Sequence, residues 1–391
     1  MKERLVLFGA GKNGQEYNRV FHERNSEGYS SVAYCDNANI LEAMDYPVIK
    51  IGEIKKQDDI IITSAKYKEI FRQLISANIQ QQVIGIFFDD KYYDVECYEK
   101  FDVDDIDFNV RKQQFHYLDQ NKIRYENDAY IRSMINQEKI VKEKINSFLD
   151  TKDLYHNLLS VSIELSNICN YSFIHKLCPA NGELRKKIIS SKIVYQILDE
   201  LGSMNFDGVL QFTAYNEPLI DPRLFSFLAY SRANIPNCYI RIYSNGFYLN
   251  EVMLAELEDI GISELDVTAY GESEWNRLRK LEPKKPYTIL MCKTAKDLDN
   301  RLNIYKKNNL NINYEQPCDS VMNLHIRANL KIARCCLDWK TGDLNYLGDV
   351  QNNSIFSITN NNQLINETID LLDSKRNYNI CNNCGWSIMD I

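Results

Sequence analysis

Residues 160–179 read Ser-Val-Ser-Ile-Glu-Leu-Ser-Asn-Ile-Cys-Asn-Tyr-Ser-Phe-Ile-His-Lys-Leu-Cys-Pro, and the interpretation of the chain depends on this stretch. A strand-like run, Ser160–Leu165, leads into a loop that carries Cys169, His175 and Cys178. Thiolate and imidazole are soft or borderline ligands, so three of them in one loop can surround a metal ion or an iron–sulfur cluster. The alternative is two buried thiols beside a histidine that hydrogen-bonds to the loop.

Strand-like and helix-like runs alternate from about residue 157 onward. Strands are expected at 160–165, 209–213, 238–243, 265–268 and 287–291, and helices at 187–201, 224–233 and 251–260. Repeated βα units predict a full or partial barrel over residues 156–310, with its functional groups at the carboxyl ends of the strands. Those ends carry Asn216, Glu217, Ser244 and Thr268. Glu217 could instead be a surface acid beside a turn proline, although its place at a strand end favours a function, and Ser244 taken singly could belong to an ordinary turn.

Residues 1–95 show the same alternation and predict a doubly wound, Rossmann-like α/β domain. An apolar run ends at Gly9, and Gly11 and Gly14 follow it into a helix-like segment. Glycines at this spacing allow a tight turn and the approach of a pyrophosphate to the helix N-terminus. Asp36 stands where an acid can bind a ribose hydroxyl. The domain is therefore either a nucleotide-binding domain or a packing module that has kept the turn.

Two further regions differ from these in composition and in hydrophobic periodicity. Residues 96–155 lack glycine and proline and favour a helical connector, or equally a docking surface. Residues 311–391 are asparagine-rich, with few regular elements expected, and contain five cysteines: Cys318, Cys335, Cys336, Cys381 and Cys384. A region with little periodicity and several cysteines usually needs a metal to hold it. Thiolates alone fit a structural zinc ion as well as an iron–sulfur cluster.

The bulk composition limits the function classes. The chain has 391 residues, enough for two or three domains, and its net charge of −8 argues against nucleic acid as a partner. No apolar stretch approaches the roughly 20 residues that span a membrane. The first residues also lack the pattern of a signal peptide. We therefore expect a cytoplasmic protein whose eleven cysteines stay reduced.

The order of motifs over residues 157–391 resembles the radical S-adenosylmethionine (SAM) enzymes that carry a C-terminal SPASM-type domain. In that family the first barrel strand leads into a cysteine loop that binds one [4Fe–4S] cluster, and its open iron takes SAM. The resemblance implies Cys169, His175 and Cys178 as the ligands here. His175 stands in the place of the middle cysteine, and the spacing is wider than the usual Cys-x3-Cys-x2-Cys.

The resemblance extends to the proposed SAM contacts and to the tail. Asn216 and Glu217 match a Gly-Gly-Glu-Pro-like turn with both glycines replaced, Ser244 begins a Thr-Asn-Gly-like turn, and Thr268 matches a polar position near SAM. In the tail, the family pattern implies one auxiliary cluster on Cys318, Cys335 or Cys336, Cys381 and Cys384. The N-terminal domain resembles Rossmann-like modules of enzymes in surface-polysaccharide and sugar-nucleotide pathways.

These resemblances imply an enzyme that cleaves SAM reductively and removes a hydrogen atom from its substrate. A small molecule such as a nucleotide-linked sugar is the first substrate class, and a peptide is the second. An electron donor such as flavodoxin or ferredoxin would be needed. Two alternatives stay open: a non-catalytic SAM- or nucleotide-binding descendant with a degenerate first cluster, and a zinc-stabilised binding protein without iron.

Overall fold

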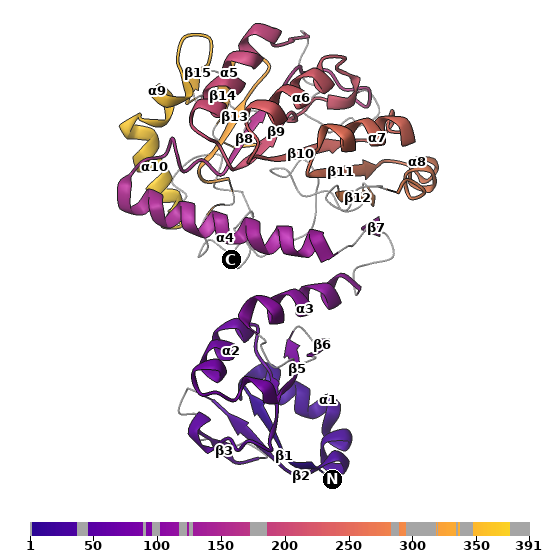
Figure 1. The fold of residues 1–391 in the computed structure, drawn as a ribbon, viewed down its shortest axis with the longest axis vertical. Coiled ribbons are helices and arrows are strands. Elements are labelled where there is room, and N and C mark those ends of the chain that lie inside the picture. Colours follow the sequence, from indigo (N-terminus) through magenta and orange to yellow (C-terminus); the bar gives the residue numbers. More distant parts are fainter. Residues whose placement is uncertain are drawn as a thin grey trace. The chain divides into compact units, whose positions relative to one another are not determined.

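The computed structural model describes residues 2–36, 46–88, 91–95, 102–116, 123–124, 128–172, 186–282, 289–294, 318, 320–333, 335–336 and 347–375. The chain divides into two compact units, Met1–Leu118 with Ile131–Ile135 and Asp119–Tyr130 with Asn136–Ile391. Each unit contains its own largely parallel sheet (Figure 1). The expected α/β architecture is confirmed in both units, whereas the domain boundaries near residues 95, 155 and 310 stay predictions.

The first unit is built on a six-stranded sheet with the order β3-β2-β1-β4-β5-β6. The strands are β1 (Lys2–Phe8), β2 (Tyr29–Cys35), β3 (Val48–Ile49), β4 (Asp59–Ile62), β5 (Val83–Phe88) and β6 (Lys91–Asp94). Among these strands only β6 runs antiparallel, pairing with β5. The helices are α1 (Lys12–Gly28), α2 (Tyr67–Ser76) and α3 (Val103–His116). The strand order is that of a Rossmann-like sheet.

Alternate residues of β1 enter two different apolar clusters, which explains why helices cover both faces of this sheet. Leu5 and Leu7 pack in a cluster with Tyr17 of α1. Val6 and Phe8 pack in the other cluster, to which α2 and α3 contribute. A strand that is apolar on both sides needs cover on both sides, because each exposed face would leave apolar surface in water.

The second unit is built on a nine-stranded sheet with the order β15-β14-β13-β8-β9-β10-β11-β12-β7. Its parallel strands include β8 (Ser160–Ile163), β9 (Val209–Gln211), β10 (Tyr239–Ser244), β11 (Glu264–Ala269) and β12 (Ile289–Thr294), and β7 (Ile123–Arg124) pairs antiparallel at one edge. Its helices include α4 (Asp128–Thr151), α5 (Ser191–Ser203), α6 (Leu224–Asn234), α7 (Glu251–Ile260) and α8 (Glu272–Leu278). The parallel strands begin close to the expected residues, but α5 begins later because Ser190 caps it through a bond from the Ile193 N–H.

The tail is more regular than the sequence predicts. It contributes β13 (Asn323–Ile326), β14 (Lys331–Ala333), β15 (Gly348–Asp349), α9 (Ile355–Thr359) and α10 (Asn362–Leu372). Strand β13 pairs in parallel with β8, so this part of the tail belongs to the same sheet as the βα units. Strands this short are difficult to predict because they hold too few residues for an alternating pattern to emerge.

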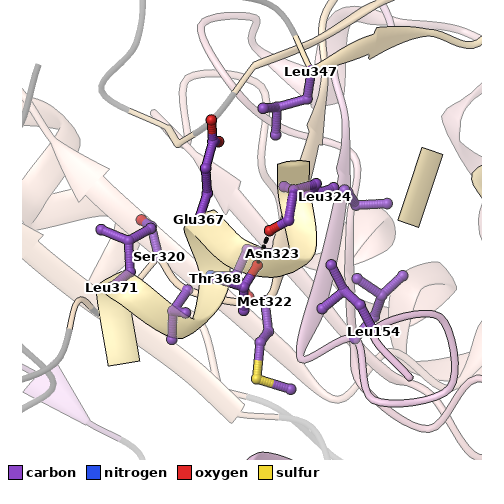
Figure 2. Close-up of a pocket in the computed structure, with 12 residues that line it drawn as sticks. Leu154, Ser320, Met322, Asn323, Leu324, Leu347, Glu367, Thr368 and Leu371 are labelled. Atoms are coloured by element: carbon purple, nitrogen blue, oxygen red, sulfur yellow. Dashed lines mark hydrogen bonds between the residues drawn. The ribbon is translucent and has the colours of Figure 1, made fainter. Parts of the chain in front are cut away.

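A small pocket lies at the start of β13, beside α10 (Figure 2). Leucine and methionine side chains dominate its lining, with Leu154, Met322 and Leu371 among them, and Glu367 and Thr368 enter it from α10. The carboxyl ends of the parallel strands lie at the other end of the strands from this pocket. The pocket therefore marks the packing of α10 on the sheet and is separate from the predicted site.

Candidate functional site

The turn after β9 holds a buried glutamate at the carboxyl edge of the sheet. Glu217 is 3% exposed, and its Oε1 atom accepts hydrogen bonds from the Leu219 N–H at 3.0 Å and the Ser244 hydroxyl at 2.8 Å. Its Oε2 atom accepts one from the Asn245 N–H at 2.7 Å. Burial raises the pKa of the Glu217 carboxyl, and the three donors oppose this. Within the part of the chain that the structure describes, no cationic side chain pairs with it.

Asn245 connects this glutamate to the cysteine loop. While its backbone binds Glu217, its side-chain Nδ2 donates to Asn170 Oδ1 at 2.8 Å and lies 3.9 Å from Cys169 Sγ. The Tyr171 N–H also donates to Cys169 Sγ, at 3.4 Å. N–H groups directed at a sulfur favour its thiolate form, which is the form that binds metal. Two of the predicted motifs and the first loop cysteine therefore meet at one place.

Helix α8 holds both of these turns. Arg277 Nη2 donates to the Gly246 carbonyl at 2.5 Å, and Glu274 Oε1 accepts from the Tyr171 hydroxyl at 2.7 Å. Gly246 has a φ of +66°, and a Cβ atom there would lie 2.4 Å from Val267 Cγ1. A larger residue would push the turn off the sheet. Glycine is therefore required at position 246 both by the positive φ and by the close packing against Val267.

Asn216 and Thr268 occupy the same edge but in different roles. Asn216 Oδ1 accepts from the Ala214 N–H at 3.0 Å, and its Nδ2 donates to the Phe212 carbonyl at 3.1 Å. Its amide is therefore used to shape its own turn. Thr268 lies on β11 and is only partly buried. The predicted roles of both residues toward SAM stay predictions.

A second network joins β8, β13 and the tail, and sequence reasoning missed it. Glu164, directly after β8, accepts from the Tyr215 N–H at 3.1 Å and the Ala328 N–H at 2.9 Å, and it pairs with Arg327 at 3.2 Å. The Arg327 guanidinium lies 4.5 Å from the centre of the Tyr215 ring, whose hydroxyl donates to the Cys336 carbonyl. This network links the tail segment with Cys336 to the carboxyl edge of the sheet. The signal available in the sequence was a charged residue, Glu164, between Ile163 and Leu165 at the end of a strand-like run.

The remaining predicted ligands are only partly placed. His175, Cys178, Cys381 and Cys384 lie outside the described residues. Cys318 precedes β13 and its N–H donates to the Leu371 carbonyl of α10, whereas Cys335 and Cys336 follow β14. Among the described residues, no three histidine, cysteine or acidic side chains gather closely enough to hold a metal ion. Both predicted ligand sets therefore stay predictions.

The sheet of the second unit has two chemically different faces. One face carries apolar residues such as Val161, Ile240, Leu265 and Leu324, which pack in the large hydrophobic core. The alternate positions of β8, β10, β11 and β13 are polar or charged, and we call this side the inner polar face. It is defined by Ser162, Arg241, Tyr243, Glu264, Asp266 and His325, and Glu164 and Arg327 extend it at the strand ends. A parallel strand buried on both sides is normally apolar on both, so this face indicates a polar contact.

In the first unit, the predicted glycine turn connects β1 to α1. Gly9 has a φ of +119°, and a Cβ atom on Gly14 would lie 2.1 Å from the Gly9 carbonyl oxygen. A Cβ atom on Gly11 would meet nothing within 4 Å. Asp36 follows β2, and its Oδ2 accepts from the Ala10 N–H at 2.7 Å. Gly9 and Gly14 are thus required by packing, whereas Gly11 leaves open space beside the turn.

Comparison with known proteins finds a sequence relative over part of the chain. No protein-family model matches the chain. The S-adenosyl-L-methionine-dependent 2-deoxy-scyllo-inosamine dehydrogenase of Niallia circulans is 29% identical over 113 residues, 28% of this chain and 44% of that protein. The predicted resemblance to radical SAM enzymes is confirmed. The chain spans less than half the length of this curated relative, so the activity of the whole protein is a proposal.

Solved structures show weaker likeness. BtrN in complex with AdoMet and 2-DOIA has a TM-score of 0.49 at 22% identity, covering 58% of this chain and 92% of that chain. SuiB of Streptococcus suis, bound to the precursor peptide SuiA, has a TM-score of 0.33 at 10% identity, covering 76% and 79%. The fold assignment rests on the strand order, because both scores are below 0.5. No helix in the described ranges is long and apolar enough to cross a membrane.

Proposed function

We propose that the second unit is an iron–sulfur enzyme of the radical SAM kind, which cleaves SAM reductively and removes a hydrogen atom from a small organic substrate. The observation that carries this proposal is the chain of contacts from Glu217 through Asn245 to Cys169. It joins a buried carboxylate, a polar turn and a cysteine at the carboxyl edge of a parallel sheet, where such folds hold their active sites. The sequence relative, a SAM-dependent dehydrogenase, points the same way.

The surroundings of Cys169 fit an iron–sulfur cluster. Its sulfur lies 3.4 Å from the Tyr171 nitrogen and 3.9 Å from Asn245 Nδ2, and it is only partly buried. Hydrogen bonds to cluster sulfurs tune the reduction potential. We propose His175 and Cys178 as the other ligands. A cluster held by these three residues would supply the electron for reductive cleavage of SAM and hydrogen abstraction from the substrate.

The surroundings of Glu217 fit the amino group of SAM. A carboxylate that is almost fully buried costs free energy unless a cation compensates it, and no described side chain does. An ammonium group of the ligand would supply that charge. The Ser244 hydroxyl and the Asn245 N–H keep the carboxylate in one orientation, so it is ready before SAM arrives. We propose Thr268 as a further contact, and Asn216 as a residue that shapes the turn.

For the tail we propose an auxiliary cluster on Cys318, Cys335 or Cys336, Cys381 and Cys384. The Tyr215 hydroxyl, which binds the Cys336 carbonyl, supports a connection between this segment and the sheet edge. A flavodoxin- or ferredoxin-like protein is the proposed electron donor. A small molecule is the first proposed substrate class, because the relative acts on 2-deoxy-scyllo-inosamine. A peptide is the second.

The proposed function is tested by anoxic reconstitution with iron and sulfide, reduction with dithionite, and addition of SAM. The expected product is 5′-deoxyadenosine, detected by mass spectrometry. Cys169→Ala should abolish it, whereas Cys35→Ala, which removes a buried thiol from the first unit, should leave it unchanged. Bound iron without 5′-deoxyadenosine would support a non-catalytic descendant, and bound zinc without iron would support the structural alternative. Either result contradicts the proposal.

We propose nucleotide binding by the first unit as a second function. The supporting observation is Gly11, which has no packing reason to be glycine and borders open space at the start of α1. Calorimetry with UDP-glucose and NAD would test it. Gly11→Val should remove binding while the unit stays folded. Absence of binding by the wild-type chain would leave the turn as a packing feature.

A further inference from the structure

The inner polar face forms rows across the sheet of the second unit. Through the strand register, His325 pairs with Ser162, Ser162 with Gln211, Gln211 with Arg241, and Arg241 with Glu264. Five polar residues from five adjacent strands therefore stand side by side. Such a row inside a protein must satisfy its own hydrogen bonds or bind something that does.

Part of this face satisfies itself. Arg241 Nε pairs with Glu264 Oε2 at 2.6 Å, and the Tyr239 hydroxyl donates to the same oxygen at 3.0 Å. The Arg241 guanidinium also lies 5.4 Å from the Tyr239 ring centre and 6.0 Å from the Tyr243 ring centre. These contacts hold the arginine in one place.

Two groups on β13 and just after it are not satisfied. Within the described part of the chain, His325 Nε2 and the Nη1 atom of Arg327 are buried and have no hydrogen-bond partner. His325 is 7% exposed and Arg327 is 8% exposed. Each such group costs about 1–3 kcal/mol when left unpaired. Burial and the charge of Arg327 lower the pKa of His325 to about 4, so its ring is neutral at pH 7 and can donate or accept a hydrogen bond.

The charges of this face indicate what kind of ligand it accepts. Among the described residues it carries guanidinium groups, such as those of Arg241 and Arg327, together with carboxylates, such as those of Glu164, Glu264 and Asp266. Hydroxyl groups, which both donate and accept, match this mixture of donors and acceptors, and an amino group matches the carboxylates.

We propose that the inner polar face binds a hydroxyl-rich ring, a neutral or amine-bearing sugar or cyclitol, through hydrogen bonds to His325 and Arg327. The proposal rests on the proposed function, because it names the substrate class of the same site. His325 and Arg327 are then residues that determine specificity.

Isothermal titration calorimetry on the reconstituted full chain with SAM tests this proposal. The probes are glucosamine, 2-deoxy-scyllo-inosamine and UDP-glucose. At least one should bind with a dissociation constant below about 1 mM, a weak but specific range. His325→Leu should weaken that binding at least about tenfold, the effect of one lost hydrogen bond of about 1.4 kcal/mol. His325→Gln, which keeps a polar group in a similar place, should retain most of it.

The stability of the same variants separates a binding role from a structural one. His325→Leu removes an unpaired buried polar atom, so its Tm should equal or exceed that of the wild type. Ser357→Ala on the exposed part of α9 serves as the control. The proposal is overturned if no probe binds, or if His325→Leu binds as tightly as the wild type. Release of 5′-deoxyadenosine is measured in parallel. Sugar binding without SAM cleavage would reject only the proposed function. SAM cleavage without sugar binding would reject only this inference.

Discussion

The backbone N–H of Asn245 donates a 2.7 Å hydrogen bond to Glu217 Oε2, which joins the ends of β10 and β9. The side chain of the same asparagine extends to Cys169, in the loop after β8. Three adjacent strand ends are thus held in one arrangement. The proposed SAM site depends on this geometry because both the cysteine and the carboxylate must face the same small molecule.

The charge of Glu217 should matter more than its shape. Glu217→Gln keeps the size of the side chain but removes the negative charge that we assign to the SAM amino group. We expect the affinity for SAM to fall by roughly tenfold to a hundredfold, the range for loss of a charge-assisted hydrogen bond. Calorimetry on the reconstituted protein measures this directly. Glu256→Gln on the exposed side of α7 is the matched control, and equal affinities in the two variants would refute the assignment.

Iron content should distinguish the two proposed clusters. Cys169→Ala should lose the iron and sulfide of one cluster and keep the other. The double change Cys335→Ala and Cys336→Ala should do the reverse, because the pair supplies one proposed ligand of the tail cluster. Metal and sulfide analysis after anoxic reconstitution measures both. If all these variants retain the wild-type iron content, neither cysteine set binds a cluster.

His325 should make the protein sensitive to acid. Its pKa is lowered to about 4 in the folded chain from 6.5, because burial penalises the charged ring. The unfolded chain therefore binds more protons between these values, and the free energy of unfolding should fall as pH drops from about 6.5 to 4, by on the order of 3 kcal/mol. Denaturant titrations at several pH values measure this loss. His325→Leu should remove this part of the pH dependence, and an unchanged profile would contradict it.

The glycines of the first unit should respond differently to alanine. A Cβ atom on Gly14 would collide with the Gly9 carbonyl oxygen, so Gly14→Ala should destabilise the first unit by about 2 kcal/mol or more. Gly11→Ala should have little effect on stability, because its Cβ atom meets nothing nearby. Thermal unfolding, monitored by circular dichroism, compares the stabilities of the two variants. Equal stability of the two variants would show that the turn relaxes around Gly14.

The sequence predicted the fold where long, periodic patterns existed. The strand–helix rhythm of residues 209–260 and the glycine turn after β1 are of this kind. It did not reveal that β13 joins β8, because four residues such as Asn323–Ile326 contain no signal for their partner. The inner polar face was missed for a related reason. Alternating residues such as Arg241 and Tyr243 indicate a strand with one polar side, but only the register shows that His325 and Glu264 stand in the same row.

In the candidate site, sequence resemblance identified Glu217, Ser244 and Cys169, which the structure brings together. It did not identify Glu164 or Arg327, because a charged residue at a strand end gives no indication of its partner in the sequence. Their roles follow from burial and pairing, which depend on strands far apart in the sequence.

The most direct test of the central claim is the electron paramagnetic resonance spectrum of the reduced, reconstituted protein with and without SAM. We expect the signal of one cluster to change shape when SAM is added, because the proposed function places the SAM-binding cluster on Cys169. Cys169→Ala should lack that signal, and Glu217→Gln should need more SAM to produce the change. A spectrum that is identical with and without saturating SAM, in protein with full iron content, would contradict the account.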